Sequence, residues 1–443
     1  IFREYDIRGL CDTELTDEVM YAIGRAFATK LRREKKKKIS LGYDLRPSST
    51  RIFAALSKGL TASGLDVLDL GLVPTPVVYF SVSHLNLDGG LCITGSHNPP
   101  EFNGLKLHLC DRPFYGQEIL ELKEIIDRND FVSEKGSVKK QEILESYKTY
   151  VLGLFTKQRK LKVVVDAGHG MGGLTAPDLF KRLGHEVVEL YTNLDPTFPD
   201  HHPDPSIPHN LEDLQKKVRE VKADVGIAFD GDADRIGVVD DQANVITGER
   251  ILLLYARDIL KRKPGAVIIG DVKCSQTIYD DIAKHGGKPI MWKTGHSLIK
   301  AKMKETGAEL AGEMSGHMFF KDRWFGFDDA VYASCRMLEI VAGSPIPLSK
   351  MLVDLPAMVS TPEIRVDCPD DKKFDVVRRC VEAFKKSYKV VDIDGARVEF
   401  PDGWGLVRAS NTQPVLVMRF EAVNEKRLAE IRALIENQIK QFS

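Results

Sequence analysis

The sequence predicts an α/β protein that consists of three related α/β domains and a smaller C-terminal α+β domain. Up to Leu355, short apolar runs rich in β-branched residues alternate with helical stretches, and the order strand, helix, strand, helix, strand, polar loop occurs three times. Bounded apolar runs of this kind are typical of strands in a parallel sheet that is buried on both faces. After Leu355, strand-like runs flank a Gly-rich turn and one helix closes the chain, which is typical of a small antiparallel domain.

Each of the three units begins with an apolar run that ends in Gly or Asp and continues with a glycine-led second run. The first runs start at Ile39, Lys162 and Ala266, and the second runs start at Gly64, Gly184 and Gly287. The third run of each unit leads into a loop of unusual composition, over residues 94–100, 230–235 and 312–317. Because ligands of α/β sheets gather where loops leave the carboxyl ends of strands, three such loops predict one shared site. Chance alternation of strands and helices in a large α/β protein is the alternative explanation.

The expected domain limits follow the changes in this pattern. The domains are expected to cover residues 1–142 with a serine-containing loop, 143–244 with an acidic loop, 245–356 with a Glu-Ser-His loop, and 357–443 as the α+β domain. In the last of these, the segments V-V-D-I-D, A-R-V-E-F and V-L-V-M-R-F-E-A are expected to be strands, and residues 425–442 a helix.

The composition argues against several classes of function. The chain has 443 residues, with 63 Lys and Arg against 64 Asp and Glu, so its formal net charge is −1. A near-neutral balance argues against a nucleic-acid partner and against an anionic membrane surface, and no apolar run approaches the roughly 18 residues of a membrane span. The seven cysteines are dispersed without a C-x-x-C pair, which predicts reduced thiols and a cytoplasmic location.

The acidic loop D-G-D-A-D-R predicts a metal site. Asp230, Asp232 and Asp234 alternate, so an extended loop can curl three carboxylates around one hard cation. An EF-hand loop would need Gly and Glu where this chain has Arg235 and Asp241, so that interpretation is rejected. Three oxygen ligands that leave room for a substrate or phosphate oxygen favour Mg²⁺. An acidic, solvated turn is the alternative.

The serine loop T-G-S-H-N-P-P is expected to present the hydroxyl of Ser96 from a tight turn. His97 is not expected to activate it, because neighbouring side chains along an extended chain point apart. The loop is also not the G-x-S-x-G elbow of hydrolases. With a metal nearby, the pattern favours phosphoryl chemistry through a phosphoserine, with Lys106 as a phosphate contact or proton carrier. A purely structural Ser in a Gly/Pro turn is the alternative.

Two further loops carry groups suited to sugar and phosphate. Glu313, Ser315 and His317 alternate and would face one side of an extended segment, where they could bind adjacent hydroxyls. The loop R-A-S-N-T-Q-P at residues 408–414 combines an Arg fork with hydroxyl, amide and backbone donors, which favours a phosphate clamp. A helix-capping turn is the alternative for each loop.

Taken in order, these loops resemble those of the α-D-phosphohexomutase superfamily, and most closely its bacterial phosphomannomutase/phosphoglucomutase branch. The resemblance covers nearly the whole chain. It rests on F-R-E-Y-D-I-R-G at 2–9, T-G-S-H-N-P-P at 94–100, P-D-H-H-P-D-P at 199–205, D-G-D-A-D-R at 230–235, V-K-C-S at 272–275, K-T-G-H-S at 293–297, G-E-M-S-G-H-M-F-F at 312–320 and R-A-S-N-T-Q-P at 408–414. The Met in G-E-M-S-G-H favours the mannose/glucose branch over the glucosamine branch.

The resemblance implies a fold and a set of roles. It implies three α/β domains with mixed sheets and a fourth α+β domain around a central cleft. Ser96 would cycle through phosphoserine, Asp230, Asp232 and Asp234 would hold Mg²⁺ together with an oxygen on phosphorylated Ser96, and Glu313 and Ser315 would bind the sugar's 3- and 4-hydroxyls, with His317 as a further contact. Arg408, Ser410, Asn411 and Thr412 would grip the non-reacting phosphate. The positions Tyr5, Arg8, Lys106, Arg235, Lys273 and His296 would line the cleft, with Arg8, Lys106 and His296 as the candidates for acid/base catalysis.

The implied activity is the interconversion of hexose 1-phosphate and 6-phosphate, of mannose or glucose, through a phosphoserine and a hexose 1,6-bisphosphate. The expected partner is the phosphosugar substrate alone. The protein itself is expected to be a monomer or a weak homo-oligomer. Two alternatives stay open at this point: a metal-dependent sugar phosphatase that uses the same carboxylates, and a non-catalytic phosphosugar sensor.

Overall fold

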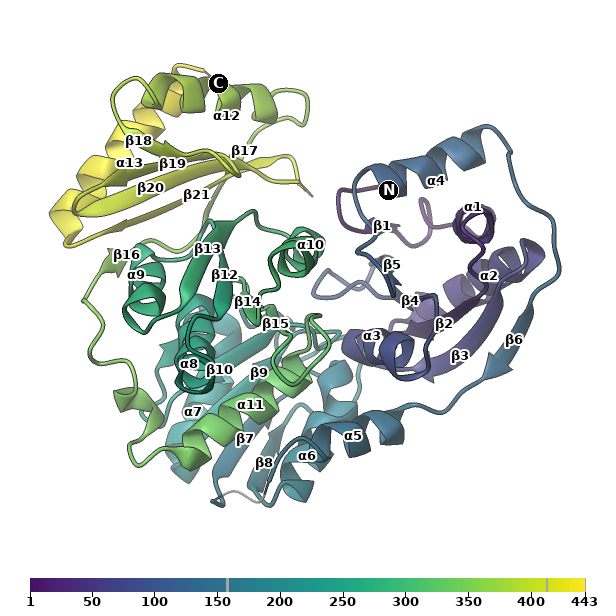
Figure 1. Cartoon of the computed structure of the whole chain (residues 1–443), viewed down its shortest axis with the longest axis horizontal. Helices are drawn as coiled ribbons and strands as arrows, with labels where there is room; N and C mark the ends of the chain where they lie inside the picture. The colour runs from purple at the N-terminus through teal and green to yellow at the C-terminus, as the bar shows by residue number, and fades with distance from the viewer. Residues whose placement is uncertain (157–158, 412, 443) are drawn as a thin grey trace.

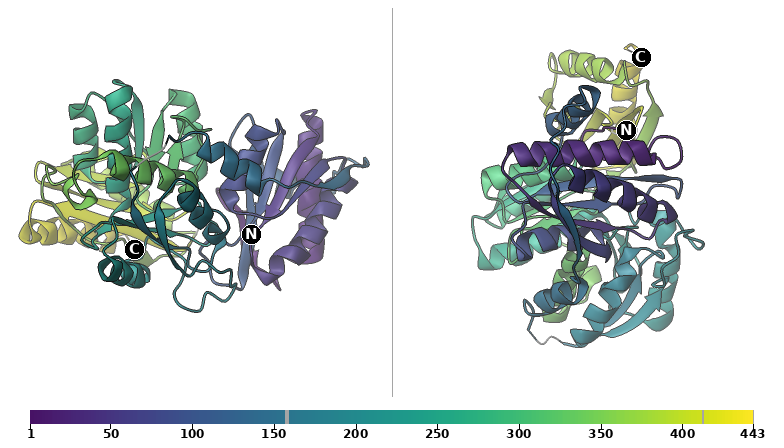
Figure 2. Two further views of the ribbon diagram at one scale, coloured as in Figure 1. Left: turned by 90° about the horizontal axis from the view of Figure 1, so that it is seen from below. Right: turned by 90° about the vertical axis from the view of Figure 1, so that its right-hand side faces the viewer.

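The computed structural model describes residues 1–156, 159–411 and 413–442. Its four sheets follow one another along an arc, which runs in Figure 1 from the N-terminal sheet (purple) through two central sheets (teal and green) to the C-terminal sheet (yellow). The left view of Figure 2 shows the N-terminal and C-terminal parts on opposite sides of the molecule. The middle of the molecule is therefore bordered by parts of the chain that are far apart in sequence.

The N-terminal sheet has six strands in the order β1-β5-β4-β2-β3-β6. Its strands are β1 (Ile7–Leu10), β2 (Lys38–Tyr43), β3 (Asp66–Leu72), β4 (Gly89–Ile93), β5 (Phe102–Leu109) and β6 (Ser137–Lys140), and its helices are α1 (Asp17–Arg33), α2 (Pro47–Ala62), α3 (Thr75–His84) and α4 (Gln117–Asp127). Helix α1 begins where the Thr16 hydroxyl accepts a hydrogen bond from Val19 N, which satisfies one free amide of the first turn. Helices α1 and α2 can pack closely because Gly59 has no side chain. A Cβ at this position would lie 2.2 Å from Tyr21 O.

The second sheet has five strands in the order β11-β10-β9-β7-β8. Its strands are β7 (Lys162–Asp166), β8 (Glu186–Leu190), β9 (Val225–Phe229), β10 (Ile236–Val239) and β11 (Val245–Ile246). Its helices are α5 (Leu144–Leu152), α6 (Ala176–Arg182) and α7 (Glu212–Val221), with 3₁₀ turns at Met171–Leu174 and Pro208–Leu211. Strand β9 is buried along its whole length, as its run of apolar residues predicts.

The third sheet has four strands in the order β13-β12-β14-β15. Its strands are β12 (Val267–Asp271), β13 (Lys288–Trp292), β14 (Leu310–Gly312) and β15 (Met318–Phe320). Its helices are α8 (Gly248–Arg262), α9 (Gln276–Lys284), α10 (His296–Thr306) and α11 (Ala330–Gly343), and a 3₁₀ turn follows at Leu348–Lys350.

These three sheets share one plan. Each contains three parallel strands, to which β6 adds a fourth in the N-terminal sheet, and the strand after the special loop (β5, β10 or β15) lies antiparallel beside the third of them. The three apolar runs of each unit, which predict parallel strands, form parallel strands in all three sheets, and the strand that follows the special loop was not predicted. A short loop can join only antiparallel neighbours, because a parallel connection needs a crossover of about a dozen residues. The mixed sheets implied by the family resemblance are confirmed, and the three special loops occupy equivalent positions.

The C-terminal part is an antiparallel sheet in the order β16-β21-β20-β19-β18, with β17 also paired to β21. Its strands are β16 (Val359–Ser360), β17 (Ile364–Asp367), β18 (Lys389–Val391), β19 (Ala396–Phe400), β20 (Gly403–Ala409) and β21 (Val415–Ala422), and its helices are α12 (Lys373–Phe384) and α13 (Glu425–Lys440). The predicted α+β architecture is therefore confirmed.

The hydrophobic cores show which parts of the molecule are joined most firmly. One large core combines residues of the second and third sheets with Phe80 and its neighbours on α3. The C-terminal part has a separate core, and a small cluster of Val272, Trp404 and Leu406 connects it to the third sheet. At this seam the buried Arg397 donates to Val272 O and Cys274 O, both at 2.7 Å. Among the described residues, no helix has both the length and the apolar character required to cross a bilayer.

Candidate active site

Ser96 lies in the loop between β4 and β5 and points into the next domain. Its Oγ is 3.0 Å from Asp230 Oδ2 and 3.2 Å from His97 Nδ1. The expectation that His97 points away from Ser96 is wrong. The expectation assumed an extended chain, whereas Ser96 has a φ of 49°, and this left-handed backbone turns the two side chains toward each other.

The three aspartates occupy the equivalent loop between β9 and β10, and all are buried. The loop closes on its first member, because Asp230 Oδ1 accepts hydrogen bonds from the amides of Asp234 and Arg235, both at 3.1 Å. Asp232 Oδ2 accepts a 2.6 Å hydrogen bond from Thr75 on α3. A Cβ on Gly231 would lie 2.4 Å from Ser96 O, so this glycine is what allows the two loops to touch.

Lys106 on β5 neutralises part of this acidic cluster. Its ammonium lies 2.8 Å from Asp232 Oδ2 and also pairs with Asp234. Burial would lower the pKa of Lys106, but Asp232 and Asp234 outweigh burial and hold the pKa well above its usual range. Burial and the neighbouring aspartates raise the pKa of Asp230 well above its usual range. The cluster thus has more carboxylates than one lysine can match.

The chemistry of the aspartate trio fits a hard cation. The three residues each offer a carboxylate oxygen within 4.8 Å of the others. Among the described residues, Asp232 Oδ1 is buried without a hydrogen-bond partner. A cation bound by the trio would also lower the free-energy cost of ionising Asp230. Oxygen ligands of this kind suit Mg²⁺. The residues present therefore fit the implied metal.

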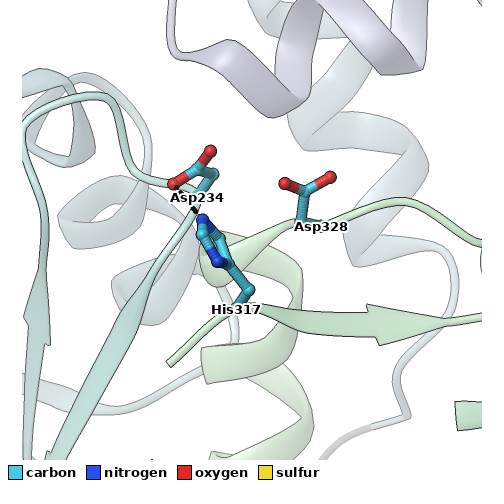
Figure 3. A group of neighbouring side chains, drawn as sticks. All are labelled: Asp234, His317 and Asp328. Atoms are coloured by element: carbon cyan, nitrogen blue, oxygen red, sulfur yellow. Dashed lines mark ion pairs between the residues drawn. The ribbon is translucent and has the colours of Figure 1, made fainter. Parts of the chain in front are cut away.

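A second acidic group consists of Asp234, His317 and Asp328, which Figure 3 shows side by side. Its charges are already matched by protein groups. Asp328 Oδ1 lies 3.0 Å from the ammonium of Lys300, and His317 pairs with Asp234 at 3.2 Å. This group is therefore better described as an ion-pair network beside the aspartate trio than as a further metal site.

Glu313, Ser315 and His317 converge in the loop between β14 and β15. They meet through a turn, in which Gly316 N donates to Glu313 O at 3.0 Å, and not along the extended segment that was expected. His317 Nδ1 lies 2.6 Å from Glu313 Oε2 and 3.4 Å from Ser315 Oγ. Burial disfavours the charged form of both residues, but their mutual pairing outweighs burial. The pairing lowers the pKa of Glu313 to about 2, and together with Asp234 it raises the pKa of His317 to about 10.

Tyr5, His296 and Asn411 bring three domains together. The Tyr5 hydroxyl donates to Thr294 O at 3.0 Å and accepts a hydrogen bond from the Asn411 amide. The rings of Tyr5 and His296 are 5.9 Å apart, edge to face. His296 Nε2 lies 3.3 Å from Asp6 Oδ1, so it bridges the first and third domains.

The predicted phosphate-binding residues lie at the seam between the third domain and the C-terminal part. Arg408 Nε donates to Asp394 Oδ2 at 2.9 Å, and Lys273 Nζ lies 3.1 Å from Glu363 Oε2. The Ser410 hydroxyl accepts a 3.2 Å hydrogen bond from Gln413 N. Thr412, predicted for the same clamp, lies outside the described residues. Carboxylates thus hold both cations near the cleft.

Arg8 and Arg235 flank the serine loop and the aspartate loop. Arg8 Nη1 donates to Asn98 Oδ1 at 2.8 Å, which attaches β1 to the serine loop. Arg235 Nη1 lies 3.9 Å from Asp204 Oδ1, and burial of Arg235 is outweighed by Asp204 and Asp230, which raise its pKa.

Some residues around this site were not identified from the sequence. Asp328 precedes the helix N-cap Asp329 and has the sequence signature of a capping residue, so nothing local indicates its pairing with Lys300. Asp44 and Arg46 follow β2 and contact the serine loop. Their position after the carboxyl end of a strand was the available signal, but only the loops after the third strand of each unit have an unusual composition.

Comparisons with known proteins agree with this geometry. Profiles of phosphoglucomutase/phosphomannomutase match in order: alpha/beta/alpha domain I at residues 1–133, domain II at 145–244, domain III at 247–359 and the C-terminal domain at 363–438. A phosphomannomutase/phosphoglucomutase of Pseudomonas syringae is 46% identical over 100% of this chain and 96% of its own length. A phosphoglucomutase of Neisseria meningitidis serogroup A is 46% identical over 99% of this chain and 96% of its own length.

A crystal structure gives the same result for the fold. The phosphoglucomutase/phosphomannomutase family protein of Burkholderia thailandensis superposes with a TM-score of 0.93 at 44% identity, covering 100% of this chain and 97% of that one. The chain therefore belongs to the phosphoglucomutase/phosphomannomutase family.

Proposed function

We propose that this chain interconverts hexose 1-phosphate and hexose 6-phosphate, with mannose or glucose as the sugar. The observation that carries the proposal is the contact between Ser96 Oγ and Asp230 within a buried trio of aspartates. The names of the full-length relatives support it. A serine hydroxyl beside a metal-binding carboxylate cluster is suited to accept and return a phosphoryl group.

The reaction has two transfers that mirror each other. In the first, the bond between phosphorus and Ser96 Oγ breaks while a bond forms to the free hydroxyl of the phosphosugar, which gives a hexose 1,6-bisphosphate. The bisphosphate then turns over in the cleft, and its other phosphoryl group passes to Ser96 Oγ. The same bisphosphate, added from outside, would phosphorylate an enzyme that has lost its phosphoryl group.

Charge compensation is the main task of the residues around Ser96. Asp230, Asp232 and Asp234 would hold Mg²⁺, which supplies Lewis-acid stabilisation of the transferring phosphoryl group when bound. Arg8 reaches the serine loop through Asn98, and Lys106 lies among the aspartates. Fixed positive groups in a buried site stabilise the negative charge of the transition state without reorganisation.

The proton of the attacking hydroxyl is assigned to His296, with Arg8 and Lys106 as the other candidates. His317 contacts Asp234 of the trio and Glu313 of the proposed sugar-binding loop, and despite burial these carboxylates raise its pKa to about 10, so it keeps its proton and acts as a charged contact. The aspartates likewise hold the pKa of Lys106 well above its usual range, which suits a phosphate contact. The ring of His296 lies 6.0 Å from that of His317, measured between centroids, and its Nε2 lies 3.3 Å from Asp6 Oδ1. His296→Asn is expected to reduce kcat.

The remaining residues would recognise the substrate in both orientations. Glu313, held ionised by His317, accepts hydrogen bonds from sugar hydroxyls, and Ser315 lies beside it. Arg408, Ser410, Asn411 and Thr412, with Lys273, Arg235 and Tyr5 nearby, would bind the phosphate that does not react. Because the C-terminal part has its own core, we propose that it moves to close the cleft and exclude water.

The proposal extends to the setting of the enzyme. All seven cysteines are free, six of them buried, which fits work in a reducing cytoplasm. Every group invoked above comes from one chain, so a monomer or weak homo-oligomer suffices, with the phosphosugar as its partner.

The test is phosphosugar profiling with added Mg²⁺ and hexose 1,6-bisphosphate. Mannose, glucose and N-acetylglucosamine 1-phosphates are supplied separately, and 6-phosphate and inorganic phosphate are measured together. Formation of 6-phosphate from mannose or glucose supports the proposal. Release of inorganic phosphate without isomerisation would instead indicate a phosphatase, and binding without turnover would indicate a sensor.

A further inference from the structure

A buried arginine supports the backbone of the serine loop through hydrogen bonds. The side chain of Arg46, at the start of α2, is 0% exposed, and its guanidinium donates to four backbone carbonyls of residues 96–102. Nη2 reaches Ser96 O at 3.0 Å and Asn98 O at 2.5 Å, and Nη1 reaches Pro99 O at 2.6 Å and Phe102 O at 2.8 Å. The loop is therefore wrapped around one planar group.

Asp44 completes this arrangement at the end of β2. Its Oδ2 accepts hydrogen bonds from Arg46 Nε at 3.2 Å and from Gly95 N at 3.0 Å, while Oδ1 accepts one from the Ser49 hydroxyl at 2.6 Å. The Asp44–Arg46 pair thus holds the loop from both sides of Ser96, by an amide before it and by carbonyls from Ser96 onward.

The loop needs such support because its backbone is not in a relaxed conformation. Ser96 has a φ of 49°, a region that residues with a Cβ seldom occupy. Gly95 lies flat against the guanidinium, and a Cβ on Gly95 would come within 2.3 Å of Arg46 Cζ. A left-handed residue persists only where its surroundings determine it, and such residues cluster at active sites.

We propose that Arg46, held by Asp44, is a positioning residue for phosphoryl transfer: it fixes the backbone of Ser96 so that Oγ faces the aspartate trio. This inference rests on the proposed function and assigns no contact between Arg46 and the substrate. Lysine cannot replace arginine here, because one ammonium cannot span four carbonyls as the planar fork does.

The first experiment measures phosphorylation of Ser96 by glucose 1,6-bisphosphate in quenched samples by intact-protein mass. Arg46→Lys is expected to slow this step about 100-fold, the effect of a displacement of about 1 Å at a reacting group. KM for glucose 1-phosphate is expected to stay within about threefold, because the substrate contacts are elsewhere. Arg51→Lys is the matched control: Arg51 lies in the first turns of α2 and donates to two carbonyls, Leu15 O and Cys11 O, neither of which belongs to the serine loop, so its variant should be phosphorylated at the wild-type rate.

Chemical rescue separates positioning from general stability. Arg46→Ala leaves a cavity of the shape of guanidinium, so guanidinium at millimolar concentration is expected to raise its phosphorylation rate at least about tenfold, whereas ammonium at the same concentration should not. Equal effects of both ions, or a phosphorylation rate of Arg46→Lys within threefold of wild type, would overturn the proposal.

A measurement on the wild-type protein covers the case in which the variants fail to fold. The Gly95 amide, bonded to Asp44, is expected to exchange its hydrogen at least about tenfold more slowly than an unprotected loop amide. Exchange at the unprotected rate would contradict the proposed support. A wild-type chain that the bisphosphate never phosphorylates would refute the proposed function itself, which is a different outcome.

Discussion

Ser96 Oγ lies 3.0 Å from Asp230 Oδ2, although 134 positions separate the two residues and they belong to loops of different sheets. The contact exists because each sheet places its special loop at the same position, and because Gly231 lets the two loops touch. The proposed nucleophile of one domain and the proposed cation-binding group of the next thus lie side by side.

Replacing the proposed nucleophile should abolish turnover and spare binding. Ser96→Ala is expected to reduce mutase activity by about 10⁴-fold or more, since both transfers pass through Oγ. Calorimetry with glucose 6-phosphate should give a Kd within about threefold of wild type, because no proposed substrate contact is lost. Ser133→Ala, a surface serine that accepts a hydrogen bond from Arg25, should behave as wild type. Full activity in Ser96→Ala would contradict the phosphoserine assignment.

The aspartate trio should bind Mg²⁺ more weakly when one charge is removed. Asp234→Asn keeps the shape of the side chain, and its Mg²⁺ affinity by calorimetry is expected to fall at least about tenfold. Chelation should inactivate the wild type, and added Mg²⁺ should restore it. Asp213→Asn, an exposed carboxylate that accepts from Tyr191, is the control. Unchanged Mg²⁺ binding in Asp234→Asn would rule out the trio as the metal site.

Arg408 should contribute to the binding of every phosphosugar. Arg408→Gln removes a charged donor, so each Kd is expected to rise about 10- to 100-fold. Arg427→Gln, an arginine of the same domain that pairs with Asp402, should leave binding unchanged. If the loss is confined to the mannose or to the glucose phosphates, Arg408 does not serve as a clamp shared by all of them.

Tyr5 should help to keep water out of the closed cleft. Its hydroxyl joins the third domain, through Thr294 O, to the C-terminal part, through Asn411. Tyr5→Phe is expected to raise the ratio of inorganic phosphate released to 6-phosphate formed by about fivefold, the effect of one hydrogen bond of ~1 kcal/mol. Tyr21→Phe on α1 is the control. An unchanged ratio would mean that this link does not limit the access of water.

Asp329 should make stability depend on pH. It accepts hydrogen bonds from Tyr332 N and from the Tyr147 hydroxyl, and burial raises its pKa from 3.8 to about 7. Between these values the folded state keeps a proton that the unfolded chain has lost, so the free energy of unfolding falls as pH rises from about 4 to 7.

Asp329→Asn stays neutral and should lack this fall. Denaturant unfolding should show that the stability of Asp329→Asn relative to wild type increases up to about pH 7 and then stays constant. The total increase is at most about 4 kcal/mol, which corresponds to a pKa difference of about 3 between the folded and unfolded states. A difference that does not change with pH would show that Asp329 is ionised in the folded protein throughout.

The meeting of the special loops could be predicted from the sequence, because each follows the third strand of a repeated unit. The same reasoning places Ser96 near the aspartates and the loop of Glu313 and His317 beside them, as the contacts of Asp230 with Ser96 and of Asp234 with His317 show. It could not give the φ of Ser96, since a Gly/Pro-flanked loop permits several turns, and the expectation for His97 failed for that reason.

Ion pairs between charged residues that are far apart in the chain could not be predicted from the sequence. Lys106 alternates inward on β5, but its two carboxylate partners belong to another domain. Asp328 and Asp329 are adjacent and both precede a helix, yet one caps the helix and the other pairs with Lys300. Tertiary contacts decide between such roles, and one sequence does not encode them locally.

The most direct test of the central claim follows a labelled phosphoryl group on Ser96. Enzyme carrying ³²P on Ser96 is mixed with unlabelled glucose 1-phosphate and Mg²⁺, and samples are quenched within one turnover. The label should leave the protein at least as fast as kcat, appear first in glucose 1,6-bisphosphate and then in free glucose 6-phosphate. Label that stays on the protein through many turnovers, or that leaves only as inorganic phosphate, would contradict the account.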